Sequence, residues 1–170
     1  MTDNLHIRPL EKEDLEFLHN MRTNPDVMDY WFSEPYTNME KLKKNFEQQQ
    51  ENESIRQFML YHGQEKIGYL GLYGIIQRHR IAQFAIMIHP DHQGKGYAAD
   101  ATKLVVDYCF NQLNIHKLSL NVIKVNEKAI HIYRKVGFEV EGELKKQYFV
   151  NGSYHDAYVM SLFREDYVAR

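Results

Sequence analysis

Apolar side chains recur along this chain with two different periods, and the change of period divides the chain into strands and helices. Alternation of apolar and polar residues is typical of a half-buried strand, whereas apolar residues every three or four positions are typical of an amphipathic helix. The order is therefore β-α-α-β-β-β-α-β-α-β-β, with an antiparallel meander in its middle. The expected strands are residues 5–9, 56–61, 66–76, 80–88, 117–122, 138–150 and 154–164, and the expected helices are residues 11–23, 38–52, 98–113 and 127–136.

Turn residues and glycines mark particular points in these strands. Asn151-Gly152 lies between the last two expected strands, and this pair is a strong signal for a two-residue hairpin. Gly68, Gly71 and Gly74 recur at three-residue spacing inside one strand. Because glycine weakens a strand, these positions indicate bulges or a close approach of another backbone.

Two segments near the N-terminus follow the pattern less closely. Residues 27–36 are aromatic and irregular, and they are too apolar for a plain exposed loop. We expect them to form a wall of a pocket or an interface. The helix 38–52 is polar, with Met39, Leu42 and Phe46 on its inward side. We expect this helix to pack loosely or against a partner.

The composition restricts the classes of function. A chain of 170 residues is long enough for one domain, residues 1–170, whose core needs no disulfide, and the lone Cys109 is expected to be a packing residue. Twenty-one basic and 23 acidic residues give a net charge of −2, so a nucleic-acid partner is not expected. No leader or bilayer-length apolar run is apparent, which favours a cytoplasmic protein without a membrane partner. The nine histidines, including His89 and His92, are expected on the surface, without a metal.

The most informative segment is Gln93-Gly94-Lys95-Gly96-Tyr97-Ala98, between the expected strand 80–88 and the expected helix 98–113. A strand, a glycine turn and a helix together form a layout that binds phosphate, because main-chain N–H groups and the helix N-terminus face the anion. A nucleotide P-loop would need serine or threonine after the lysine, but here Gly96 and Tyr97 follow it. A dinucleotide fingerprint would need an acid at the end of the next strand, and residues 123–125 contain none.

The same segment resembles the pyrophosphate loop of the GNAT N-acetyltransferase superfamily, Arg/Gln-x-x-Gly-x-Gly/Ala. A second signature of that superfamily follows at the expected separation. Each of its residues also has an ordinary structural role, such as capping a helix, ending a helix or contributing to an apolar stripe. Their occurrence together and in order supports the resemblance. The matching residues are Gln93, Gly96 and Ala98 in the loop, and Asn126, Ala129, Tyr133, Gly137 and Phe138 in the second signature.

This resemblance implies a fold, a co-substrate and a set of site residues. The fold is the GNAT α/β fold, a mixed, mostly antiparallel sheet flanked by helices. The co-substrate is acetyl-CoA, and a free amine attacks the thioester directly in a ternary complex. Tyr133 would protonate the departing thiolate and Glu34 would accept a proton from the amine. The residues implied to contact the coenzyme are Ile86, Met87, Ile88, Gln93, Gly94, Lys95, Gly96, Tyr97, Ala98, Asn126, Lys128, Ala129 and Tyr133.

Residues 30–36 and the helix 127–136 resemble the polyamine branch of the superfamily, the bacterial spermidine/spermine N-acetyltransferases. That branch usually carries paired glutamates before the proline and further acids elsewhere. Each missing carboxylate weakens the attraction for a multiply charged amine, so a shorter diamine is as plausible as spermidine and a regulatory spermine site is not favoured. The acids are replaced here by Ser33, Lys41, Gly74 and Gln83. The implied amine contacts are Met28, Tyr30, Trp31, Glu34, Gln83 and Phe84.

Two other functions stay open at this point. One is a protein N-terminal acetyltransferase of the ribosomal-protein type, which would need an open groove between residues 28–36 and the final hairpin. The other is a non-catalytic sensor that binds coenzyme A without turnover. The aromatic segment 27–36 and the weakly amphipathic helix 38–52 indicate self-association, and the resemblance implies a homo-oligomer, a dimer or larger.

Overall fold

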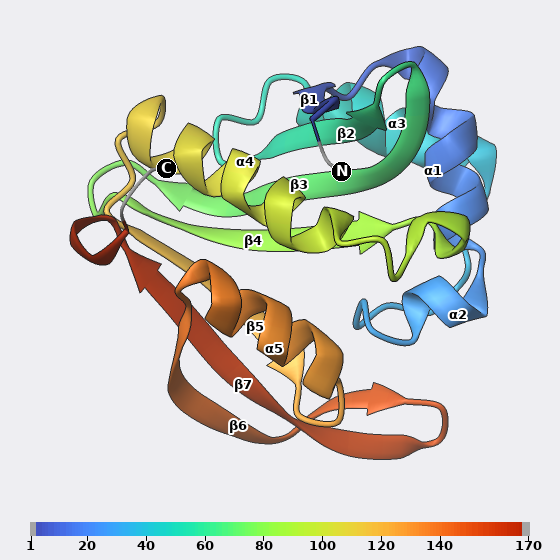
Figure 1. Ribbon diagram of the computed structural model, residues 1–170. Coiled ribbons are helices and arrows are strands. Elements are labelled where there is room, and N and C mark those ends of the chain that lie inside the picture. The colour runs from blue at the N-terminus through green and yellow to red at the C-terminus, as the bar shows by residue number, and fades with distance from the viewer. Residues whose placement is uncertain (1–2, 168–170) are drawn as a thin grey trace.

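The computed structural model describes residues 3–167, and its seven strands form one sheet in the order β1-β2-β3-β4-β5-β7-β6 (Figure 1). Every pair of neighbours is antiparallel except β4 and β5, which are parallel. The predicted mixed, mostly antiparallel sheet is therefore confirmed. The strands are β1 (Leu5–Pro9), β2 (Arg56–His62), β3 (Glu65–Ile76), β4 (Ile81–Ile88), β5 (Lys117–Ile123), β6 (Glu139–Val150) and β7 (Ser153–Phe163).

The helices cover the two faces of this sheet unequally. Helices α4 and α5 lie together on the face turned toward the viewer in Figure 1. Helices α1, α2 and α3 pack over β2, β3 and β4 on the opposite face, around a second, smaller core. The α-helices are α1 (Leu15–Arg22), α2 (Pro25–Met28), α3 (Met39–Gln49), α4 (Tyr97–Asn111) and α5 (Glu127–Val136), and short 3-10 turns occupy Lys12–Asp14, Pro90–His92 and Arg164–Asp166.

The N-terminal helices differ from the expectation, and one of them, α2, was not expected at all. The predicted helix 11–23 begins as a 3-10 turn, in which Asp14 bonds back to the N–H of Glu11 at 2.9 Å, and becomes α-helical only at Leu15. Helix α3 does not pack loosely. Its Leu42 is 3 % exposed and joins the second core, where α3 contacts α1.

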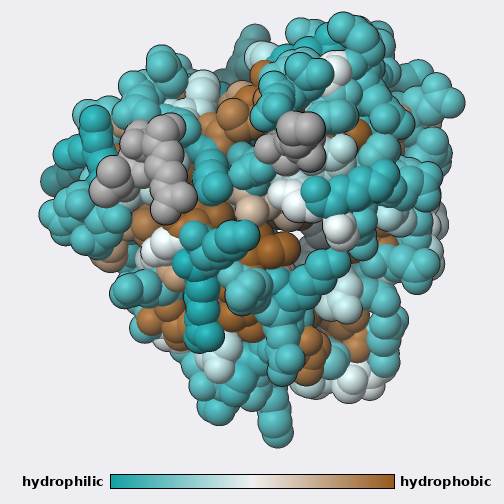
Figure 2. All heavy atoms as spheres, in the orientation of Figure 1, coloured by the Kyte–Doolittle hydropathy of each residue, from teal (hydrophilic) through white to brown (hydrophobic). Residues whose placement is uncertain are grey.

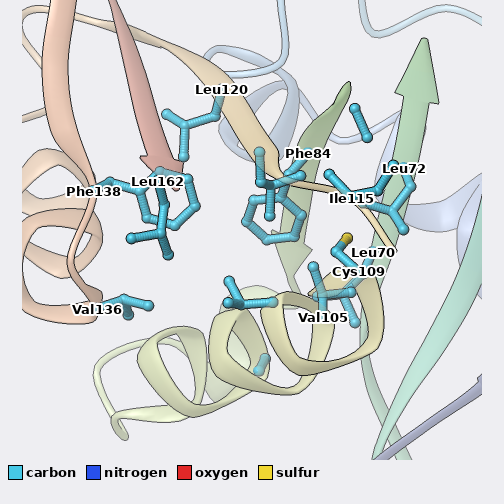
Figure 3. Close-up of a cluster of buried hydrophobic side chains, with 14 of the residues drawn as sticks. Leu70, Leu72, Phe84, Val105, Cys109, Ile115, Leu120, Val136, Phe138 and Leu162 are labelled. Carbon is cyan, nitrogen blue, oxygen red and sulfur yellow. The ribbon is translucent and has the colours of Figure 1, made fainter. Parts of the chain in front are cut away.

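The main core lies between the sheet and the helices α4 and α5. Figure 3 shows Phe84, Leu120 and Leu162 of three strands pointing toward Val105 and Cys109 of α4. Cys109 is fully buried, and burial raises the pKa of its thiol to about 12. The thiol therefore stays protonated near neutral pH, which agrees with its predicted role as a packing residue.

Three of the predicted backbone features are present. Asn151 and Gly152 have φ of +49° and +82°, which is the two-residue hairpin turn that the sequence predicts. A Cβ atom on Gly68 would lie 2.5 Å from the carbonyl oxygen of Met87, so β4 approaches β3 too closely there for any side chain. The register between β3 and β4 shifts after Tyr73, where Gly74 has a φ of +55°.

The sheet splits between its two central strands. The pairing of β4 with β5 is limited to three neighbouring positions, from Ile81 opposite Lys117 to Gln83 opposite Ser119. Beyond them the strands diverge, as Figure 1 shows, and β5 continues along β7 alone. On the face seen in Figure 2, hydrophobic side chains show at the surface near the middle, in the region between α4 and α5, with hydrophilic residues around them. The split thus leaves one edge of β4 without a partner strand.

Candidate active site

The free edge of β4 presents the peptide groups of alternate residues. A residue in a strand points its N–H and C=O to the same side, and the next residue points them to the other side. The carbonyl oxygen of Arg80 accepts hydrogen bonds from the β5 side. The carbonyl oxygens of Ile86 and Ile88 accept hydrogen bonds from side chains that lie at the free edge. The N–H groups of Phe84, Ile86 and Ile88 therefore face the split, whereas the peptide of Met87 faces β3.

Two side chains donate hydrogen bonds to carbonyl oxygens of this free edge. The indole Nε1 of Trp31 donates to the oxygen of Ile86 at 3.0 Å, and the amide Nε2 of Gln93 donates to the oxygen of Ile88 at 3.1 Å. The edge thus presents N–H donors next to carbonyl groups that already have partners. Such an edge suits a ligand whose carbonyl oxygens need donors.

The loop after β4 presents a second set of donors. Gly94 and Gly96 have φ of +76° and +85°, a conformation that glycine adopts without strain. Gly96 is the N-cap of α4, and no side chain caps the first turn of this helix. A Cβ on either glycine would meet nothing within 4 Å, so the space in front of the loop is open. The loop and the first turn of α4 therefore fit an anionic group such as a diphosphate, with Lys95 exposed beside it.

Helix α5 carries the second motif along the other side of the split. Asn126 caps the helix, since its side-chain oxygen accepts a hydrogen bond from the N–H of Ala129 at 3.2 Å. Gly137 ends it at a φ of +121°, and its N–H bonds to the carbonyl oxygen of Tyr133 at 3.1 Å. These residues have the structural roles that the sequence suggests, and they fix Tyr133 in the last turn of the helix. Lys128 lies on the exposed side of the same helix.

Tyr133 connects α5 with the free strand. Its ring lies edge-on to Phe84 of β4 at 6.4 Å and to Phe138 at 5.9 Å between centroids. Burial raises the pKa of its hydroxyl well above the ordinary value. The phenol therefore keeps its proton throughout the physiological range and can act as a donor.

The segment 28–36 reaches the free edge from the opposite face of the sheet. Trp31 and Phe32 are half-buried, whereas Tyr30 is 53 % exposed and Glu34 is exposed. The ring of Phe32 stacks on the ring of Tyr148 in β6 at 3.6 Å between centroids, and the Tyr148 hydroxyl accepts a hydrogen bond from Asn121 in β5 at 2.7 Å. The segment is thus joined both to β4 and to the final hairpin.

The predicted amine contacts do not all lie at a surface. Met28 and Phe84 are 5 % and 4 % exposed, and their side chains belong to the two cores. Their side chains pack behind the free edge of β4, and their contact with the amine stays a prediction. Gln83 is exposed at the point where β4 and β5 separate.

Sequence reasoning missed the residues that hold the segment in place. Neither the bond from Trp31 to Ile86 nor the bond from Asn121 to Tyr148 was expected, because each joins residues that are far apart in the chain. One signal was present: Lys117, Ser119 and Asn121 alternate with apolar residues in β5. This alternation indicates that one face of the strand is polar, although it does not identify the partner.

Some features lie outside this region or are not found in the described residues. A surface cavity of about 290 Å³ lies between the end of β1 and the C-terminal end of α3, away from the split. No group of three or more His, Cys, Asp or Glu side chains within residues 3–167 is arranged to hold a metal ion. Over the same residues, no helix is both long and apolar enough to cross a membrane.

Comparison with known proteins is consistent with this geometry. The model of the acetyltransferase (GNAT) domain matches residues 4–139. The chain is 47 % identical over 163 residues to the spermidine N(1)-acetyltransferase of Escherichia coli (strain K12), and the aligned region covers 96 % of this chain and 88 % of that protein. It is 39 % identical over 171 residues to the Vibrio cholerae spermidine N(1)-acetyltransferase, covering 100 % of this chain and 99 % of that one. The crystal structure of spermidine N-acetyltransferase from Vibrio cholerae in complex with CoA and spermine has a TM-score of 0.95 at 38 % identity and covers 97 % of this chain and 98 % of that chain.

Proposed function

Since this chain belongs to the GNAT acetyltransferase family, whose members use acetyl-CoA, we propose that it transfers an acetyl group to a primary amine of a polyamine such as spermidine. The observation that carries the proposal is the split between β4 and β5, which exposes a row of N–H donors between the glycine loop and Tyr133. The relatives that act on spermidine supply the substrate class.

The coenzyme would be held at three places. The loop from Gln93 to Ala98 and the first turn of α4 would bind the diphosphate through their N–H groups. The free edge of β4 would pair with the pantetheine arm and would place an N–H of Ile86 or Ile88 near the thioester oxygen. Preorganised backbone donors aimed at a developing oxyanion typically contribute several kcal/mol to transition-state stabilisation.

The amine needs a deprotonation step before it attacks. An alkylamine with a pKa near 10 is mostly protonated at pH 7, and reaching the neutral form costs about 4 kcal/mol. Glu34 is the proposed proton acceptor, directly or through water, because it is an exposed carboxylate in the segment that faces the free edge. The neutral amine then attacks the thioester carbon, and the phenol of Tyr133 donates its proton to the departing sulfur.

The acceptor is proposed to be a spermidine-like or shorter amine. Aromatic faces in the segment 28–36 suit an alkylammonium group. Ser33 and Gln83 stand where the polyamine branch usually has acids, so less negative charge is available for a distal ammonium group. A diamine that needs fewer anionic contacts is therefore the second acceptor to test.

A peptide acceptor is less well supported. A protein N-terminal acetyltransferase needs an open groove between the segment 28–36 and the final hairpin. In this structure the stacked rings of Phe32 and Tyr148 join these two elements. A coenzyme sensor without turnover would not need the phenol of Tyr133 at the split, where its burial keeps the proton on the hydroxyl.

The experiment is a free-thiol release assay with purified protein and acetyl-CoA. Spermidine, putrescine, lysine and a short peptide are offered in parallel. We expect turnover with spermidine or putrescine and little with the peptide. Turnover with the peptide alone would favour the N-terminal acetyltransferase, and coenzyme binding without turnover of any amine would favour the sensor.

Replacement of Gly96 by alanine is expected to raise KM for acetyl-CoA about tenfold. Alanine at a φ of +85° costs roughly 1–2 kcal/mol, and the loop would relax away from the geometry that aims its N–H groups. Gly74→Ala is the matched control, because Gly74 also has a positive φ of +55° with open space in front of it, and it lies in β3 outside the loop. Equal KM values for the two variants would show that the loop does not bind the coenzyme.

We also propose that the protein is cytoplasmic, where acetyl-CoA is available, and that it forms homo-oligomers. Phe149 and Tyr154 at the tip of the final hairpin are 62 % and 65 % exposed and contact each other at 5.3 Å between ring centroids. Exposed aromatic side chains of this kind are typical of interfaces. A single monomeric species in analytical ultracentrifugation at micromolar concentration would exclude self-association in solution.

A further inference from the structure

Trp31 makes a hydrogen bond that lies at the centre of the proposed site. It is the one tryptophan in the sequence. Its indole N–H donates to the carbonyl oxygen of Ile86 at 3.0 Å, across 55 positions of the chain. The bond connects the segment 28–36 with the strand that is proposed to hold the thioester. We call this segment the acceptor side, because the amine that accepts the acetyl group is proposed to bind there.

The Ile86 carbonyl is placed where a strand partner is missing. Pairing with β5 ends at Gln83, so this oxygen, three residues further along β4, has no strand opposite. Left alone, it would be bound by water or by a donor from the ligand. Because the indole bonds to it instead, the position of the segment 28–36 is fixed relative to the N–H groups of Ile86 and Ile88.

The indole ring is also held from behind. It packs at 5.9 Å between centroids on the ring of Tyr69, whose side chain is fully buried. The Tyr69 hydroxyl is bonded to the hydroxyl of Tyr73 and accepts a hydrogen bond from Gln57 at 2.8 Å. The rotamer of Trp31 is therefore constrained by packing on one side and by the Ile86 bond at its edge, while the half-buried ring keeps some surface open.

We propose that Trp31 is the positioning residue of the acceptor side: its bond to Ile86 fixes the distance between the attacking amine and the thioester, and its ring face receives the alkylammonium chain. The proposal rests on the proposed function and adds to it the residue that sets the geometry of attack. A displacement of about 1 Å between reacting groups can lower the rate about a hundredfold. The effect is therefore expected in kcat for amine transfer, while binding of the coenzyme is left nearly unchanged.

Trp31→Phe tests the contribution of the hydrogen bond separately from that of the ring, because phenylalanine keeps an aromatic face and has no N–H. We expect kcat with spermidine to fall roughly ten- to a hundredfold, while the dissociation constant for coenzyme A and the melting temperature stay close to those of the unmodified protein. Trp31→Ala should in addition raise KM for spermidine, because the ring face is lost. Tyr108→Phe is the control. Tyr108 packs edge-on to Phe58 in the main core, outside the segment 28–36, and its variant should keep full activity.

Because Trp31 is the one tryptophan, its fluorescence reports directly on the acceptor side. We expect a saturable change in emission when spermidine is added to the complex with coenzyme A. An unchanged kcat in Trp31→Phe, or emission that does not respond to spermidine in a protein that acetylates it, would overturn the proposal. A loss of kcat accompanied by an equal loss of coenzyme affinity would also overturn it, because the role would then be structural. Absence of acetylation by the unmodified protein would instead reject the proposed function.

Discussion

Replacement of Tyr133 by phenylalanine is expected to lower kcat roughly ten- to a hundredfold, with KM for acetyl-CoA nearly unchanged. The variant keeps the ring that packs on Phe84 and Phe138 and loses only the hydroxyl. At ordinary pKa values, proton transfer from a phenol to a thiolate is uphill by about 2 kcal/mol, and burial of Tyr133 raises the pKa of its hydroxyl further. The phenol therefore assists the departure of the sulfur without being indispensable, and steady-state kinetics with spermidine measures the effect.

Tyr108→Phe is the matched control for this prediction. Tyr108 is another half-buried tyrosine of the main core, and it packs edge-on to Phe58 of β2, whereas Tyr133 packs on Phe84 of β4. The raised pKa of Tyr133 gives a second readout. Its hydroxyl stays protonated up to at least about pH 10, so the rate should rise with pH as the amine deprotonates. A fall in rate between pH 8 and 10 that disappears in Tyr133→Phe would contradict the proposed role.

Replacement of Asp14 by alanine is expected to destabilise the fold by about 2–3 kcal/mol. The side chain of Asp14 is fully buried and its Oδ1 lies 2.9 Å from Lys66 Nζ and 3.2 Å from Arg8 Nη2. It also accepts hydrogen bonds from the Tyr61 hydroxyl at 3.2 Å and from the N–H of Glu11 at 2.9 Å. Breaking a buried ion pair typically costs about 3–5 kcal/mol, and a smaller cost is expected here because both cations are partly exposed and can turn toward solvent. Urea denaturation of the two proteins measures the difference.

Asp14 also makes the stability depend on pH. Burial alone would raise the pKa of its carboxyl, but hydrogen bonds from Lys66 and Glu11 together with the charges of Lys66 and Arg8 lower it overall. The folded state therefore binds this proton less readily than the unfolded state. The stabilisation is complete above the unfolded pKa, near 4, and is lost as the pH falls through the lower folded value.

Two variants control for the Asp14 prediction. Asp14→Asn keeps an acceptor for the Glu11 N–H and should fall between the unmodified protein and Asp14→Ala. Glu143→Gln removes a carboxylate paired with Lys124 and Lys145 at the surface of β6 and should leave the midpoint of urea denaturation nearly unchanged. Equal stability of Asp14→Ala and Glu143→Gln would show that the buried network is not important for the fold.

The sequence predicted those parts of the fold that depend on neighbouring residues. The alternation of apolar residues identifies the seven strands, and the hairpin at Asn151-Gly152 follows from the turn chemistry of two residues. The caps of α5 could equally be predicted from the sequence, because Asn126 and Gly137 act within one turn of their own helix. The positions of the glycine loop and Tyr133 came from two local motifs and their separation.

The remaining features depend on contacts between distant segments. No local pattern marks Asp14 as buried, because its burial requires partners from β1, β2 and β3. The bond from Trp31 to Ile86 requires both the split of the sheet and a packed Tyr69 behind the indole. Periodicity places Phe84 on the buried face of its strand. It cannot distinguish a residue that packs in the core from one that contacts the amine.

A calorimetric titration of coenzyme A into the purified protein tests directly whether the chain binds the coenzyme. If the donors of the free β4 edge and of the glycine loop hold the coenzyme, one saturable site with a micromolar dissociation constant is expected, of the order of −8 kcal/mol. Absence of binding at millimolar coenzyme A by a folded protein would contradict the account.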